Sequence, residues 1–306
     1  MHLYCAAVYT NNYKPDQARW EKLNEREREI VVSVPHILES FHYVKGQRYV
    51  DDMRRDGAKV FLDSGAFSMW NIGETVDVAE YCHYVKENVD IIRHDDGVVM
   101  ASVLDAVNNP LQTYRNQLEM EWRGVVPLPC FHFGEDERYL EYYMSRYPYI
   151  TIGGMVKKTA DQLTSWLDRI WNRYILDGAG RPRAKFHGFG LTSVSLMERY
   201  PWYSTDSSSW IQAAAFGSIY HPLHGPIAVS SKSPSRHDKG RHLTTFTGPE
   251  KEYVLADLIK RGFDLDRLAT IYESRAAFNL SGYCELNALM NNREKPPTAK
   301  PIELLQ

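Results

Sequence analysis

Three aspartates and a histidine stand at the ends of short apolar runs, where a fold could gather their side chains. Asp63 closes KVFLD, Asp105 closes VVMASVLD, His132 follows VVPLPCF and Asp206 closes YSTD. An aspartate after a strand often serves only as the N-cap of the next helix. Several acidic strand ends in one parallel sheet would instead line a single carboxylate pocket. Two such carboxylates permit glycosidic chemistry, in which one attacks or stabilises the sugar carbon and the other moves a proton on the leaving group.

The elements that must position these residues alternate along the chain. Short runs rich in Val, Ile, Phe and Tyr are predicted strands, at 5–10, 30–34, 59–63, 98–105, 125–131, 149–153, 185–190 and 203–206. Amphipathic stretches between them are predicted helices, at 75–88, 110–122, 135–147 and 160–175. This β-α-β-α alternation is typical of a parallel sheet. Eight predicted strands favour a (β/α)8 TIM-like barrel, whose active site lies at the carboxyl ends of the strands. No GxGxxG motif follows the first strand, which argues against a dinucleotide-binding fold.

Three regions are expected along the chain. Residues 1–248 should form the catalytic barrel, and 249–292 a helical extension packed on it. Residues 293–306 are rich in proline and are expected to form a tail.

Composition places the chain among ordinary globular proteins. Of its 306 residues, 43% are hydrophobic and 25% are charged, so it can bury a core without disulfides or a metal. The pairing of low hydrophobicity with high net charge that marks disorder is absent. No apolar run of about 18 residues is present, which excludes a membrane span. The start, MHLYCAAVYT, has no secretory signal pattern, so a cytoplasmic location is expected.

The cysteines are Cys5, Cys82, Cys130 and Cys284, and none form a CxxC pair. Their wide spacing predicts reduced thiols rather than a clustered zinc site. We therefore expect neither a metal nor a cofactor.

Charge singles out one segment, residues 230–242, which reads SSKSPSRHDKGRH. The net charge of the whole chain is 36 − 39 = −3, so no global basic field for nucleic acid exists. Composition alone fits a solvated loop, whereas the functional interpretation is contact with backbone phosphates. The cations assigned to that contact are Lys232, Arg236, Lys239 and Arg241.

The most specific motif is DSGAFS, at 63–68. It resembles the DSGGF signature of the tRNA-guanine transglycosylase family, which folds as a (β/α)8 barrel. The resemblance implies that Asp63 acts in catalysis and that Ser64, Gly65 and Phe67 contact the substrate base. It covers roughly half of the chain, from about residue 61 to residue 210.

Later landmarks follow in the same order as in that family. By the resemblance, Asp105 in VLDAVNNP grips the edge of the base, and Gly153 and Gly154 in TIGGM approach the base through the backbone. Asp206 follows an HGFG stretch and corresponds to the nucleophile. His132 stands near a base-reading glutamine of the family, which makes it a further candidate for substrate binding.

Departures from the family pattern indicate a particular branch. Ala66 replaces the second motif glycine, and no Cys-x-Cys-x-x-Cys cluster is present, so the zinc subdomain is not expected. SSSW follows Asp206 where the tRNA enzymes place a basic residue that helps to read the anticodon. The chain is therefore more similar to the shorter, mostly bacteriophage-encoded DpdA branch. Members of that branch exchange guanine in DNA for a 7-deazaguanine such as preQ0.

The reaction implied by the resemblance is a double displacement. Asp206 attacks C1′ of a deoxyguanosine, guanine leaves, and the incoming base, deprotonated at N9 by Asp63, displaces Asp206. The target base must flip out of the duplex to reach such a site. The aromatic residues near the motifs could stack on it or simply fill the core; they are Phe67, Trp70, Trp202 and Trp210.

The expected partners are therefore DNA and a free 7-deazaguanine base, with helper proteins left open and no membrane. One alternative is a tRNA-directed transglycosylase, against which the missing zinc cluster argues. Another is a barrel glycoside hydrolase acting on free sugars, which would leave the DSGAF motif and the glycine pair without a purpose. A non-catalytic nucleic-acid-binding module has only the 230–242 segment in its favour.

Overall fold

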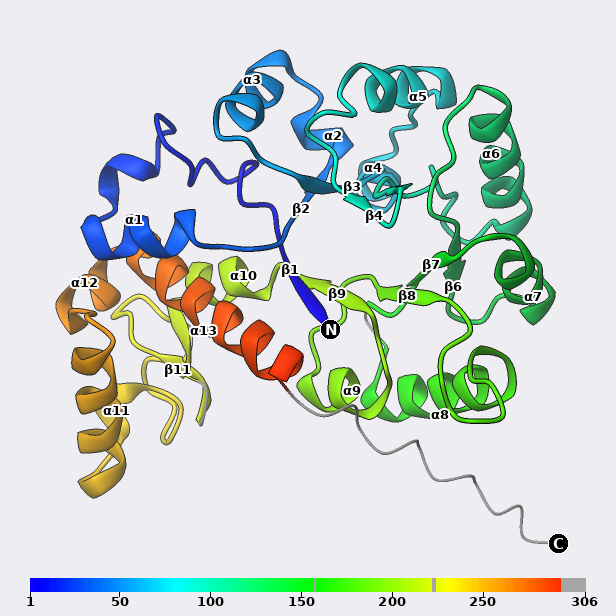
Figure 1. The fold of residues 1–306 in the computed structure, drawn as a ribbon. Helices are drawn as coiled ribbons and strands as arrows, with labels where there is room; N and C mark the ends of the chain where they lie inside the picture. The colour runs from blue at the N-terminus through cyan, green and yellow to red at the C-terminus, as the bar shows by residue number, and fades with distance from the viewer. Residues whose placement is uncertain (157, 222–223, 293–306) are drawn as a thin grey trace, which may run out of the picture. The chain divides into compact units, whose positions relative to one another are not determined.

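The computed structural model describes residues 1–156, 158–221 and 224–292 (Figure 1). The chain divides into two compact units, each described here by itself. The first contains Met1–Thr10, His36–Ser207 and residues 290–292, and the second contains Asn11–Pro35 and Ser208–Leu289. The expected tail, 293–306, lies outside the described residues.

The first unit is built on a curled sheet of seven parallel strands, in the order β3-β2-β1-β9-β8-β7-β6 (Figure 1). Single bridges also join Leu62 to Ala101 and Ser102 to Leu128. The mixed α/β class with a parallel sheet is thus confirmed. The strands are β1 (His2–Ala6), β2 (Ile37–Ser40), β3 (Val60–Asp63), β6 (Cys130–His132), β7 (Tyr149–Gly153), β8 (Lys185–Gly188) and β9 (Ser204–Ser207). A small antiparallel pair joins β4 (His94–Asp95) to β5 (Val98–Val99).

Most of the helices that connect the parallel strands lie around the outside of the sheet (Figure 1). Local capping fixes several starts: Asn109 caps α6, with proline in the first turn, and Thr159 forms a capping box with Gln162 at α8. The helices are α2 (Phe41–Val44), α3 (Gln47–Arg55), α4 (Ala66–Ile72), α5 (Val78–Glu87), α6 (Pro110–Trp122), α7 (Glu137–Arg146), α8 (Ala160–Ile170) and α9 (Val194–Arg199). A π-helical turn, Trp171–Ile175, continues α8.

Large side chains from different strands fill the interior of the sheet. The buried cluster consists of Tyr4, Ala6, Leu38, Phe61, Met100, Leu128 and Tyr149. Strands covered on both faces bury nearly every residue, which explains their short continuous apolar runs. Some buried polar side chains lie within the strands, among them Glu39, His187 and Ser204, and others stand at the carboxyl ends.

Some predicted elements differ from the observed ones. The strand expected at 30–34 is wrong, because Ile30 and Val31 lie in helix α1 (Glu25–Val32), which Asn24 and Glu27 start with a capping box. Residues 7–10 form a turn rather than a strand, and Ala7 has a φ of 67°. Strand β2 was not expected, because the buried Glu39 interrupts its apolar run.

The second unit combines helices with one hairpin. Buried Glu27 accepts hydrogen bonds from Arg267 and Ser274, which ties α1 to the C-terminal helices. The hairpin pairs β10 (Ser218–His221) with β11 (Gly225–Ala228). The other helices are α10 (Ser209–Ala215), α11 (Gly248–Lys260), α12 (Leu265–Thr270) and α13 (Tyr272–Asn292). Within the described ranges of both units, no helix has the length and apolar character needed to cross a membrane.

Candidate active site

Asp63 ends β3, and its carboxylate shapes the turn into α4. Its Oδ2 accepts a hydrogen bond from the Gly65 backbone N–H at 3.0 Å, and its Oδ1 lies 3.5 Å from Ser102 Oγ. Gly65 has a φ of 78°, and a Cβ there would lie 2.4 Å from Ser40 Oγ. The DSG sequence therefore has a local reason, since only glycine fits this close, left-handed turn.

The protonation of Asp63 is shifted into the neutral range. Burial raises its pKa to about 7, and the nearby charges of Asp105 and Asp206 act in the same direction. A carboxyl group with this pKa can both donate and accept a proton near neutral pH, which is the property that general acid–base catalysis needs.

Asp105, His132 and Glu135 form a continuous hydrogen-bonded group. His132 Nε2 lies 2.9 Å from Asp105 Oδ2, and its Nδ1 lies 2.9 Å from Glu135 Oε1. Ser64 Oγ donates to Asp105 Oδ1 at 3.1 Å. Burial lowers the pKa of His132, whereas the neighbouring Cys130 and the hydrogen bonds to Asp105 and Glu135 raise it, and the net shift is well above the usual range. The ring thus lies between two carboxyl groups.

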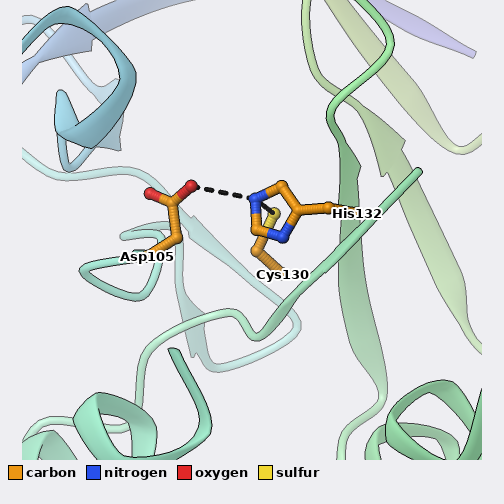
Figure 2. A group of neighbouring side chains, drawn as sticks. All are labelled: Asp105, Cys130 and His132. Carbon is orange, nitrogen blue, oxygen red and sulfur yellow. Dashed lines mark hydrogen bonds and ion pairs between the residues drawn. The ribbon is translucent and has the colours of Figure 1, made fainter. Parts of the chain in front are cut away.

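Cys130 completes the only His/Cys/Asp/Glu group in the described ranges whose donor atoms converge enough to hold a metal ion (Figure 2). The ligand-type atoms of Asp105, Cys130 and His132 all lie within 4.8 Å of one another, and Cys130 Sγ is 3.4 Å from His132 Nε2. These donor types suit zinc. Cysteine spacing alone could not find this group, because it joins one cysteine to residues of other types. Glu135 holds His132 Nδ1, and His132 Nε2 faces both Asp105 Oδ2 and Cys130 Sγ.

The glycine pair lies beside this histidine. Gly153 ends β7, and a Cβ there would lie 3.0 Å from His132 Cδ2 and 3.2 Å from Cys130 Sγ. Gly154 has a φ of 72°, and a Cβ would meet the Phe133 backbone nitrogen at 2.9 Å. The pair thus lets β7 approach the His132 strand closely.

Asp206 lies in β9 and is largely buried. Its Oδ1 accepts a hydrogen bond from the Gly190 backbone N–H at 2.8 Å and lies 3.2 Å from His187 Nε2. Burial lowers the pKa of His187 despite the opposing effect of Asp206, so this ring is neutral. Sequence reasoning missed His187 as a site residue, although the HGFG stretch contains it.

The structure thus brings most of the predicted site residues into the first unit. Asp63, Ser64, Asp105 and His132 are linked directly or through Ser102, whose Oγ also accepts a hydrogen bond from the Ser64 N–H. Asp206 makes no hydrogen bond to this group among the described residues, but its charge reaches Asp63.

The aromatic candidates differ in how far their side chains are exposed. Phe67 and Trp70 on α4 are 45% and 54% exposed, with ring centroids 6.4 Å apart in a stacked arrangement. Trp202 is buried and donates its Nε1–H to the Leu196 carbonyl. Trp210 is completely buried in the second unit. Trp202 and Trp210 are therefore core residues, and Phe67 and Trp70 remain available for stacking.

The basic segment 230–242 belongs to the second unit and is mostly turn structure. In the described part of the chain, no carboxylate pairs with its four candidate cations, which are exposed. Its role in phosphate contact stays a prediction. The side chains concerned are those of Lys232, Arg236, Lys239 and Arg241.

Comparison with known proteins adds no family. The chain matches no protein-family model and no curated protein.

Proposed function

We propose that the chain is a DNA-guanine transglycosylase that exchanges guanine in DNA for a 7-deazaguanine such as preQ0. The observation that most directly supports this proposal is the group of three motif aspartates. Burial and the charges of Asp105 and Asp206 raise the pKa of Asp63 to about 7. A carboxylate nucleophile grouped with a carboxyl group that titrates near neutrality suits glycosidic exchange at physiological pH. The order of these residues agrees with the tRNA-guanine transglycosylase family and its DpdA branch.

We further propose that the sheet closes into a full (β/α)8 barrel. The bridges Leu62–Ala101 and Ser102–Leu128 support an eighth parallel segment between β3 and β6. Asp105 would then stand just beyond the carboxyl end of that segment, which is where barrel enzymes carry their catalytic groups.

The proposed reaction has two balanced steps. Asp206 attacks C1′ of the target nucleotide, the C1′–N9 bond breaks with its electron pair going to guanine, and Asp63 gives guanine a proton. Asp63 then takes the N9 proton of the incoming base, whose nitrogen attacks C1′ and expels the Asp206 carboxylate. Both protonation states of Asp63 are accessible near pH 7, so one residue serves both steps.

The binding roles follow from the same contacts. Asp105 is held by Ser64 and His132, so its carboxylate is oriented to accept the N–H groups on the edge of a guanine-like base. Phe67 and Trp70 offer exposed rings on which a flipped base can stack.

The test is incubation of the full chain with preQ0 and either DNA or tRNA, followed by mass spectrometry of the released nucleosides. The proposal expects 7-deazaguanine in deoxynucleosides from the DNA reaction. Incorporation only into tRNA would favour the tRNA-directed alternative. Cleavage of free glycosides without base exchange would favour a hydrolase.

A further inference from the structure

A line of buried polar side chains lies behind Asp206 and crosses three neighbouring strands. Tyr149 Oη lies 2.5 Å from Ser204 Oγ, Ser204 Oγ lies 2.6 Å from His187 Nδ1, and His187 Nε2 lies 3.2 Å from Asp206 Oδ1. Tyr149, Ser204 and His187 are each 1% exposed or less. Buried polar groups are costly unless every one is paired, and here each has its partner.

With a neutral His187 ring beside the Asp206 carboxylate, one arrangement of donors and acceptors satisfies every group in this line. His187 carries its proton on Nε2 and donates to Asp206, Ser204 donates to Nδ1, and Tyr149 donates to Ser204. If the proton were on Nδ1 instead, the lone pair of His187 Nε2 would face the Asp206 carboxylate oxygen, and the two would repel each other. Burial raises the pKa of Tyr149 well above its usual range, so this phenol remains a donor.

Aromatic packing holds the histidine ring in place. The centroids of Phe61 and Phe189 lie 4.6 Å and 4.7 Å from that of His187, and Tyr4 lies at 6.0 Å. The ring is fully buried among them. Its Nε2–H is therefore aimed at Asp206 by packing as well as by the Ser204 hydrogen bond.

The two carboxylate oxygens of Asp206 differ in their hydrogen-bond partners. The N–H groups of Gly190 and His187 both reach Oδ1, whereas no donor from the described residues reaches Oδ2. We propose that Tyr149, Ser204 and His187 form a positioning relay that fixes the orientation of the Asp206 carboxylate and leaves Oδ2 as the attacking oxygen. This inference rests on the proposed function, in which Asp206 is the nucleophile.

The positioning role has a consequence for the reaction rate. A nucleophile held in a near-attack geometry gains rate from orientation, and a misplacement of about 1 Å costs about 10²-fold. Loss of the relay should therefore lower kcat and leave the affinity for free base unchanged.

Two readouts on the full chain test the relay. In ¹⁵N NMR, the His187 ring, assigned by the signal lost in His187→Gln, should be neutral and protonated on Nε2 at pH 7. In exchange of radiolabelled guanine into DNA, His187→Leu should lower kcat about 10²-fold with the KM for guanine unchanged. His187→Gln should recover at least tenfold of this loss, because its amide N–H can replace the Nε2–H.

Tyr149→Phe covers the case in which His187→Leu does not fold, since it removes only a hydroxyl group from the far end of the relay. It should lower kcat several-fold. The matched control is Tyr203→Phe, which removes a tyrosine hydroxyl that donates to Asp95 outside the relay and should leave kcat unchanged.

The outcomes distinguish a failure of the relay from a failure of the proposed function. A charged His187 ring, or one protonated on Nδ1, would overturn the relay whether or not exchange occurs. Undiminished kcat in folded His187→Leu or in Tyr149→Phe would overturn its positioning role. A wild-type protein that shows the Nε2–H form but exchanges no base would instead refute the proposed function and leave the hydrogen-bonded line intact.

Discussion

His132 Nε2 lies 2.9 Å from Asp105 Oδ2. This contact links His132, at the end of β6, to Asp105, which directly follows Leu104. Glu135 holds the other ring nitrogen, so the ring lies between two carboxyl groups. Ser64 holds the second oxygen of Asp105, so both oxygens of this carboxyl group have a fixed partner.

The first prediction concerns metal content. Purified protein should contain no stoichiometric zinc, because its four cysteines are too widely spaced in the sequence for the usual clustered site. Elemental analysis of wild type checks this, with Cys130→Ser for comparison and Cys82→Ser as a control that changes a buried cysteine outside the group. One zinc per chain, lost in Cys130→Ser and kept in Cys82→Ser, would contradict it.

Some regular elements followed from local patterns. Helix α6 begins and ends at the predicted residues, because Asn109 and Pro110 mark its start clearly. Strand β7 is an uninterrupted buried run and was predicted to the residue. Strand β2 escaped notice because Glu39 is buried there, accepting hydrogen bonds from the backbone of Tyr9 and from Thr10, and only the fold supplies those partners.

The candidate site was predictable mainly at or near the carboxyl ends of strands. Asp63 and His132 end their strands and were found by position. His187 and Ser204 lie within strands and look like ordinary strand residues in the sequence. They meet because β8 and β9 pair with His187 opposite Ser204, and this register between strands is not encoded in the pattern of either one.

The second prediction is that Asp206→Asn abolishes exchange and keeps the fold. The amide oxygen can still accept the N–H groups of Gly190 and His187, but an amide does not attack C1′. Exchange should fall by more than about 10³-fold, as for other lost nucleophiles. Rate measurements and thermal unfolding check both parts. Near wild-type incorporation would show that another residue is the nucleophile.

The third prediction is that Asp63→Ala lowers the exchange rate by about 10²–10⁴-fold, the usual contribution of a general acid–base residue. The control is Asp77→Ala, which removes an aspartate that only caps α5. Asp77→Ala should cost about 1 kcal/mol of stability and leave exchange unchanged. If Asp63→Ala lost less than tenfold in rate, Asp63 would be a cap as well.

The fourth prediction concerns the stability of the fold against pH. The folded state loses the Asp63 proton near pH 7, whereas the unfolded chain loses it near 3.8. Between these values the folded state binds more protons, so stability contributed by this group falls as the pH rises. Burial likewise raises the pKa of Glu39 to about 7, and this residue adds to the same decline.

Denaturant unfolding between pH 4 and pH 8 checks this prediction. Buried His36 and His187, whose pKa values are lowered by burial, act in the opposite direction, so the measured quantity is the stability of wild type minus that of Asp63→Asn. This difference should fall as the pH rises from 4 to 8, and Glu39→Gln provides the comparison for the other buried carboxyl group. A difference that does not change over this range would contradict the raised pKa of Asp63.

The last prediction is that the segment 230–242 contacts DNA phosphates. Its four cations are exposed and, among the described residues, have no carboxylate partner, so they are free to neutralise phosphates. Replacing all four by alanine should weaken DNA binding for every sequence and reduce the salt dependence by about 0.9 in slope per lost contact on duplex DNA. Binding of the free base should stay unchanged, because its proposed pocket uses other residues. A control set removes four exposed cations elsewhere: Lys86, Arg146, Arg173 and Lys260. Binding isotherms at several salt concentrations decide the outcome, and a slope that matches wild type would make the segment a solvated loop.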